Sequence, residues 1–145
     1  MMPESAVPLP QPLAPVPTRE SFFLTAELSS LSQLRGQLGR FLDKLEVGDE
    51  AFYDALLVAH ELAANAITHG SWARDRIEVQ AELLRDRLRI TVFDEARGLA
   101  PFAFTADEDR ESGRGLQIVG RLAEWSESVV GGRRKVSADL PLGDA

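Results

Sequence analysis

The chain has 145 residues, a length typical of a single domain with a two-layer core. It has no cysteine and two histidines, which excludes disulfide scaffolds and thiolate metal sites and argues against a multi-histidine metal site. A net charge of −7 argues against a nucleic-acid-binding module, and no apolar run reaches the roughly 20 residues of a membrane span. The N-terminus also lacks the features of a secretory signal. We therefore expect a cytoplasmic protein that contacts neither nucleic acid nor membrane directly.

Residues 1–20 contain six of the eight prolines of the chain. Because proline removes a backbone donor and fixes φ, neither a helix nor a sheet can propagate there. We expect an extended tail, for which a proline-rich docking peptide is the alternative interpretation. The folded domain is predicted to cover residues 21–145.

The first elements of that domain are a strand and a helix. Hydrophobic residues alternate over residues 21–28, which is a strand period. Ser30 and Gln33 predict a capping box that opens a helix over residues 30–45. The rest of the pattern predicts a second helix, an antiparallel hairpin, a long polar loop, a short helix and a closing hairpin, over residues 49–69, 77–92, 95–114, 115–123 and 125–140.

The order of these elements decides the fold class. Because the helices come in blocks and not after every strand, the class is predicted to be α+β. We expect a two-layer α/β sandwich, in which helices cover one face of a mostly antiparallel mixed sheet.

Glu61 and Asn65 lie four residues apart on the second predicted helix, and therefore on one face of it. Such pairs often only solvate the outer face of a helix. Here the helix is apolar nearly all round over residues 55–67, so both side chains are expected to be half-buried and to need partners. A carboxylate and an amide that face one cleft suit a base and a cation ligand. An opposite stripe is predicted to face the core: Phe52, Leu56, Ala59, Ala63 and Ala66.

Two further segments combine glycine with charge. Asp94 and Gly98 follow the strand at 88–92, where a rigidly held carboxylate suits a binding site and where Asp and Gly also suit a plain turn. The run Ser112-Gly113-Arg114-Gly115-Leu116 precedes the short helix. Glycines at a helix N-terminus let phosphate oxygens approach backbone N–H groups, although a flexible loop entering a helix gives the same pattern.

Together, the order, spacing and element type of these three segments resemble the N, G1 and G2 boxes of the GHKL ATP-binding superfamily, which has the Bergerat fold. The resemblance covers residues 22–142. Within the superfamily, the compact single domain looks like the anti-sigma-factor serine kinases of bacterial stress and sporulation control.

The resemblance implies roles for the matching residues. Glu61 matches the glutamate that acts as general base, and Asn65 matches the asparagine that coordinates the Mg²⁺ bridging the ATP phosphates. Asp94 matches the aspartate that accepts a hydrogen bond from the adenine amino group, and Gly98 matches a glycine beside the base.

The glycine-rich run is implied to hold the phosphates. Gly113 and Gly115 match the glycines whose backbone closes over them, and Arg114 and Leu116 belong to the same implied ATP-binding segment. Two positions depart from the family pattern. Ala96 replaces a glycine, which a negative φ would accommodate, and Lys135 stands nearest to the place of a threonine that helps to bind adenine.

The resemblance thus implies a protein serine kinase that uses ATP and Mg²⁺ to phosphorylate an anti-sigma-factor antagonist of the STAS type, and that sequesters a sigma factor. It also implies a homodimer. The departures at Ala96 and Lys135 favour the alternative, a non-catalytic module of the same fold that switches protein partners. A third interpretation, the ATPase half of a sensor histidine kinase, is disfavoured because residues 1–20 cannot supply its dimerisation helices.

Overall fold

The computed structural model describes residues 17–97 and 111–142, with the backbone alone for residues 111–115. The predicted order of elements is confirmed over these residues. In chain order they are β1 (Arg19–Thr25), the 3-10 turn η2 (Leu28–Ser30), α1 (Leu31–Leu45), α2 (Asp49–His69), β2 (Arg76–Leu83), β3 (Arg87–Asp94), α3 (Glu111–Leu122), β4 (Glu124–Val130) and β5 (Arg133–Pro141). Most of the predicted tail, Gly98 and most of the predicted polar loop lie outside the described residues.

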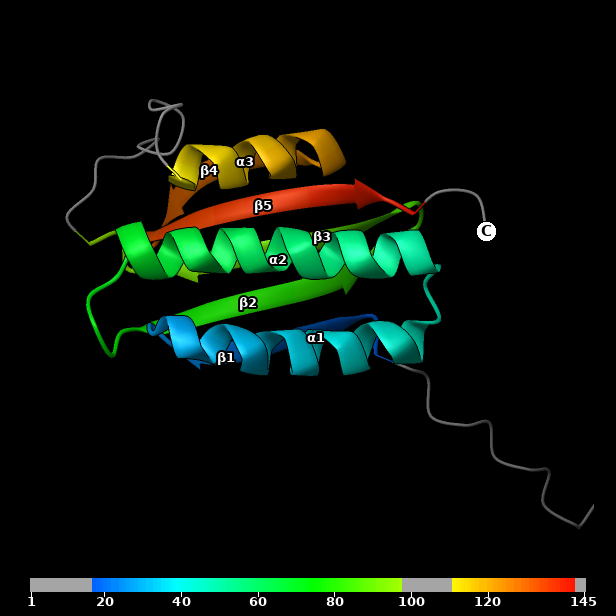
Figure 1. The fold of residues 1–145 in the computed structure, drawn as a ribbon, viewed down its shortest axis with the longest axis horizontal. Coiled ribbons are helices and arrows are strands. Elements are labelled where there is room, and N and C mark those ends of the chain that lie inside the picture. Colours follow the sequence, from blue (N-terminus) through cyan, green and yellow to red (C-terminus); the bar gives the residue numbers. More distant parts are fainter. Residues whose placement is uncertain (1–16, 98–110, 143–145) are drawn as a thin grey trace, which may run out of the picture.

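The five strands form one sheet in the order β1-β2-β3-β5-β4, and all four pairings are antiparallel. All three helices lie on one face of this sheet, with α2 across its middle and α1 and α3 on either side (Figure 1). This is the predicted two-layer α+β architecture. The turn between β4 and β5 has φ of 59° at Gly131 and 80° at Gly132, a conformation that favours glycine at both positions.

Side chains alternate along the strands, so each strand sends every second residue under the helices. On β3 and β5 the inward residues are even-numbered, and the apolar ones are fully buried: Leu88, Ile90, Val92, Val136, Ala138 and Leu140. Helix α1 covers β1 with an apolar stripe that includes Leu34, Leu38 and Leu42. No helix among the described residues is long and apolar enough to cross a membrane.

Helix α2 is turned slightly from the predicted orientation. Ala59, Ala63 and Ala66 face the core as predicted, but Phe52 and Leu56 are only half-buried. Val58, Leu62 and Asn65 are buried in addition. A 21-residue helix that crosses the sheet between two neighbouring helices is buried on its flanks as well as toward the sheet, so a single stripe does not describe it.

Two local predictions are wrong. Ser30 has helical φ and ψ of −73° and −14°, and its side chain makes no capping bond. The reason is that η2 runs directly into α1, so the N–H of Leu31 already bonds the carbonyl of Leu28. At the other end of the domain, α3 begins at Glu111, four residues before the predicted start. The glycine-rich run is thus the first part of a helix, which the packing of Leu116 and Val119 against the core anchors.

Candidate functional site

Helix α2 crosses β3 so that the last turns of the helix lie beside the end of the strand (Figure 1). This brings Asn65 and Asp94 to the wall of one small, enclosed cavity. The apolar residues around the same cavity come from α2, α3, β3 and β5: Leu62, Ala66, Leu116, Val92 and Val136. The structure therefore brings together three of the predicted site residues, Asn65, Asp94 and Leu116.

The other predicted residues surround this cavity less closely. Glu61 is half-buried on α2, one turn before Asn65. Gly113, Arg114 and Gly115 form the first part of α3, directly before Leu116. Gly98 lies outside the described residues, so its proposed place beside a base remains a prediction.

Asp94 is the buried carboxylate of the site, with 2% of its surface exposed. Its Oδ1 accepts a hydrogen bond of 2.7 Å from the Ala96 N–H and one of 3.3 Å from Nε of Arg134. Burial raises the pKa of Asp94 above its usual value, and the bonds from Ala96 and Arg134 oppose that rise. A carboxyl group held in this way at a cavity wall is a typical feature of a binding site.

Gly70 packs directly against this carboxylate. A Cβ built on Gly70 would overlap both oxygens of Asp94. The backbone of Gly70 is fixed as well, because its carbonyl accepts a 3.0 Å hydrogen bond from the Arg97 N–H. The end of α2 and the segment after β3 are thereby held together, and only glycine fits between them.

Ala96 adopts a φ of +55°, in the left-handed region that favours glycine. The negative φ that would accommodate the alanine is therefore not adopted. The turn needs this conformation so that the Ala96 N–H points back to Asp94 two residues earlier. The preference of the family for glycine here follows from this geometry, and an alanine tolerates it at a cost of about 1 kcal/mol.

Arg134 is a site residue that the sequence interpretation missed. It lies opposite Asp94 in the β3–β5 register, and its side chain is 1% exposed. Its Nη1 atom lies 3.7 Å from Oε1 of Glu127, whose side chain is 2% exposed. Strand alternation is the signal that would have found it. Every second residue of β5 faces the helices, and Arg134 lies two residues before the inward Val136.

Lys135, by contrast, lies on the other face of the sheet, where it pairs with Phe93 and Ser128. The prediction that it stands nearest to the adenine-binding position is wrong. After the two-residue turn at Gly131 and Gly132, β5 begins at Arg133, so its even-numbered residues face the helices. Arg134 occupies the position beside Asp94.

Asn65 is 6% exposed, and its buried Nδ2 atom has no hydrogen-bond partner among the described residues. A buried amide without a partner is costly unless a ligand completes it. The amide group can bond a phosphate oxygen through nitrogen, or a cation through oxygen after a half-turn. Its chemistry therefore fits a metal-bound phosphate group. No cluster of three or more His, Cys, Asp or Glu side chains forms a metal site among the described residues.

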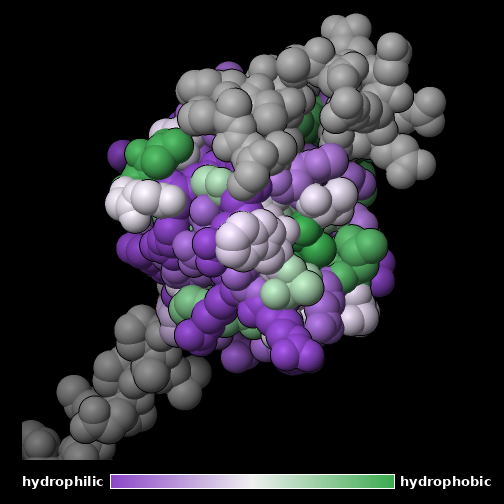
Figure 2. Space-filling model, turned by 90° about the vertical axis from the view of Figure 1, so that its left-hand side faces the viewer, coloured by the Kyte–Doolittle hydropathy of each residue, from purple (hydrophilic) through white to green (hydrophobic). Residues whose placement is uncertain are grey.

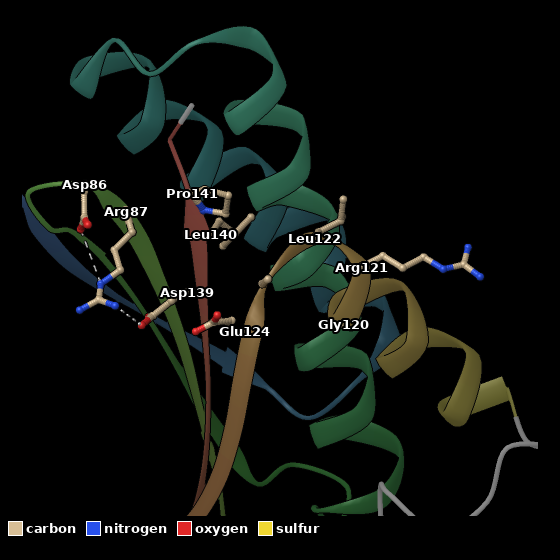
Figure 3. A pocket seen from close by; sticks show the side chains of 10 residues that line it. Asp86, Arg87, Gly120, Arg121, Leu122, Glu124, Asp139, Leu140 and Pro141 are labelled. Carbon is tan, nitrogen blue, oxygen red and sulfur yellow. Dashed lines mark ion pairs between the residues drawn. The ribbon is translucent and has the colours of Figure 1, made fainter. Parts of the chain in front are cut away.

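The end of the molecule that carries these residues is seen in Figure 2, where the visible coloured surface is mainly hydrophilic with separate apolar patches. A larger hollow of about 390 Å³ lies at the opposite ends of β3 and β5, lined by residues such as Asp86, Arg87 and Asp139. In Figure 3, Arg87 pairs with Asp86 and Asp139, and Arg121 points away. Seven residue steps along β3 separate the two sites, about 23 Å, so this hollow contains no predicted site residue.

Comparison with known proteins agrees with this geometry. The model of the histidine kinase-like ATPase domain family matches residues 24–137. The solved RsbU and RsbW domains of Rv1364c from Mycobacterium tuberculosis are similar, with a TM-score of 0.64 and 20% identity over 88% of this chain and 33% of that chain. The blue-light activated histidine kinase EL346 of Erythrobacter litoralis matches with a TM-score of 0.57 and 21% identity, over 77% of this chain and 42% of that one. A search of curated proteins gave no significant match.

The present chain spans about a third of the first of these structures and less than half of the second. At such identities the likeness concerns the fold, which is the GHKL type that the three sequence segments predicted. The family match covers most of the chain and includes Glu61, Asn65 and Asp94. The chain belongs to the histidine kinase-like ATPase domain family.

Proposed function

We propose that this domain is an ATP-dependent protein serine/threonine kinase of the anti-sigma-factor type. In this proposal it phosphorylates an anti-sigma-factor antagonist, sequesters a sigma factor, forms a homodimer and works in the cytoplasm. The observation that carries the proposal is the cavity shared by the buried carboxylate of Asp94 and the partnerless amide of Asn65. The family match and the similar fold of a structure that contains an RsbW domain support it.

In this proposal Asp94 recognises the base. Its Oδ1 is engaged by Ala96 and Arg134, which leaves Oδ2 to accept a hydrogen bond from the amino group of adenine. Apolar side chains such as Val92 and Val136 provide surfaces for the flat ring. A buried carboxylate that loses this donor is left incompletely satisfied, so ATP is preferred over nucleotides without the amino group.

Asn65 and Glu61 handle the phosphates. Asn65 would hold Mg²⁺, which supplies positive charge that offsets the negative phosphate oxygens. Glu61, one turn earlier and accessible from outside, accepts the proton of the attacking hydroxyl. The free backbone N–H groups of the first turn of α3, up to that of Gly113, face the phosphates with the positive end of the helix dipole, and Arg114 and Gly115 follow in the same segment. Leu116 anchors that helix in the cavity wall. The family resemblance assigns Gly98 a place beside the base.

The test is transfer of labelled phosphate from ATP to a purified antagonist of the STAS type. We expect Glu61→Ala to reduce transfer by about 10²–10⁴-fold with little change in ATP affinity, because a base acts mainly in the transition state. Asn65→Ala is expected to reduce Mg²⁺-dependent binding and transfer together. Asp54→Ala is the matched control, since Asp54 is a half-buried carboxylate two turns earlier on the same helix. Equal transfer by the parent and Glu61→Ala would contradict the assignment of the base.

A second candidate function is a non-catalytic module that switches protein partners. The observation that favours it is the charged, buried Arg134, whose Nε lies 3.3 Å from Oδ1 of Asp94 at the candidate site. This candidate predicts that the parent binds its antagonist or a sigma factor but transfers no phosphate and hydrolyses no ATP. An acid-stable phosphoprotein in the transfer assay would support the serine/threonine kinase and contradict the module.

A further inference from the structure

The inward face of the sheet contains a group of three buried charged side chains at the end where the candidate site lies. Asp94 on β3, Arg134 on β5 and Glu127 on β4 come from three adjacent strands, and the side chain of each is at most 2% exposed. Charges so far from water require each other as partners. Such a group stabilises a fold less than apolar residues of the same volume would, which points to a role in the site.

The hydrogen bonds to the Asp94 carboxylate from described residues reach only one of its two oxygens. Nε of Arg134 and the N–H of Ala96 both donate to Oδ1 of Asp94, and no described residue donates to Oδ2. Oδ2 instead lies against Gly70, where no side chain stands in its way. One oxygen of the carboxylate is thus held by the protein, and the other is left for a ligand.

Arg134 does not line the cavity that Asp94 lines. It approaches Asp94 from β5, and Glu127 on the next strand lies on its other side, with 3.7 Å between Nη1 and Oε1. An arginine placed in this way acts on a ligand through the carboxylate and does not touch the ligand itself. Its Nε donates to Asp94 while Nη1 stays within ion-pair distance of Glu127, and the single nitrogen of a lysine could not hold both contacts at fixed angles.

We propose that Arg134, backed by Glu127, is a positioning residue for base recognition: it orients the carboxylate of Asp94 so that Oδ2 accepts the amino group of a purine nucleotide. The inference rests on the proposed ATP-binding function. It adds that the selectivity for an amino-purine depends on a residue outside the cavity.

The experiment measures the affinities of the full chain for ATP and for purine riboside triphosphate, which lacks only the amino group. The parent is expected to prefer ATP by about 10-fold or more, since the analogue leaves the buried carboxylate without its donor. Arg134→Met is expected to reduce this preference to less than about 3-fold and to leave the affinity for the analogue nearly unchanged. Arg133→Met is the matched control, because Arg133 is the neighbouring arginine on the opposite face, and it should keep the preference of the parent.

A purely structural role for Arg134 would weaken both nucleotides alike, and this result would overturn the inference. A folded Arg134→Met variant with the full preference for ATP would overturn it as well. If Arg134→Met does not fold, Arg134→Lys provides the test, because it keeps the charge but loses the fork; an unchanged preference there contradicts the inference. If the parent binds neither nucleotide, the proposed function fails and the inference fails with it. If the parent binds both equally, only the role of Asp94 and Arg134 in base recognition is overturned.

Discussion

Arg133 and Arg134 are neighbours on β5, yet they belong to two different environments. Arg133 lies on the open face of the sheet, where its Nη1 is 3.1 Å from Oε1 of Glu78 and its guanidinium stacks 4.5 Å from the ring centre of Phe93. Its side chain is 42% exposed. Arg134 points the other way, under the helices, and is 1% exposed between Asp94 and Glu127.

The open face carries several further pairs of this kind. Arg89 bonds Asp139 through two nitrogens, at 2.7 Å and 3.1 Å, and Nη1 of Arg87 lies 3.4 Å from the same carboxylate. Water and salt screen such contacts, so each contributes from zero to about 1 kcal/mol. The buried group must instead compensate for the loss of hydration, and it gains little net stability from doing so. Similar charged pairs are therefore screened by solvent on the open face and are held away from water under the helices.

The largest effect expected from this contrast is on stability. Arg134→Met should lower the free energy of unfolding by about 3–5 kcal/mol, because it removes the buried cation that bonds the carboxylate of Asp94. Arg133→Met should lower it by less than about 1 kcal/mol. Denaturant unfolding of both variants measures the difference, and equal effects would show that the two environments do not differ as described.

Substitution of two glycines, Gly70 beside the site and Gly36 on the exposed side of α1, should have the next largest effect. Gly70→Ala should destabilise the fold by about 1–3 kcal/mol and weaken ATP binding, because its Cβ would overlap the carboxylate of Asp94. The matched control is Gly36→Ala, on the exposed side of α1, where the nearest atom is the flexible end of Arg40 at 3.6 Å. There the same change should stabilise by about 0.5–1 kcal/mol. Thermal unfolding of the two variants should move in opposite directions; a neutral Gly70→Ala would argue against the tight contact.

A fall in pH should change the stability contributions of Asp139 on the open face and of Asp94 under the helices in opposite directions. The hydrogen bond from Arg89 lowers the pKa of Asp139, so this group stabilises the fold above its ordinary pKa of about 4 and loses that contribution as the pH falls further. Burial raises the pKa of Asp94, so its contribution is present at low pH and is lost as the pH rises through the raised value.

Asp139→Asn should therefore reduce the loss of stability between about pH 4 and pH 2, on the order of 0.5–1 kcal/mol in low salt. Unfolding curves over this pH range measure it. High salt should shrink the difference between the variant and the parent, because both partners are partly exposed. An Asp139→Asn variant with the same acid profile as the parent would contradict the ion pair.

The smallest expected effect is at Ala96. Ala96→Gly should stabilise the domain by up to about 1 kcal/mol, because glycine adopts a φ of +55° without strain while its greater freedom in the unfolded chain offsets part of the gain. Thermal unfolding of the variant and the parent is the measurement. A clear loss of stability would mean that the alanine methyl makes a contact that outweighs the strain.

The fold followed from the sequence because its signals are local. The alternation in β2 and β3 and the spacing in α1 and α2 placed these elements to within one or two residues. The three sequence segments also brought Asn65 and Asp94 together correctly. Arg134 and Glu127 were missed because they follow no motif. They come together with Asp94 only because the sheet order places β5 between β3 and β4. The early start of α3 was missed because glycines usually end helices, whereas tertiary packing overrides that propensity here.

The central claim is that Asp94 recognises the base of ATP, and calorimetric titration of ATP into the parent and Asp94→Asn tests it most directly. We expect the parent to bind ATP in the micromolar range or more weakly, and the variant to bind about 10-fold or more weakly than the parent. The amide of the variant turns its NH₂ donor either toward the donors of Ala96 and Arg134 or toward the amino group of adenine. Asp139→Asn, on the open face, should bind as the parent does. Equal ATP affinity of Asp94→Asn and the parent would contradict the account.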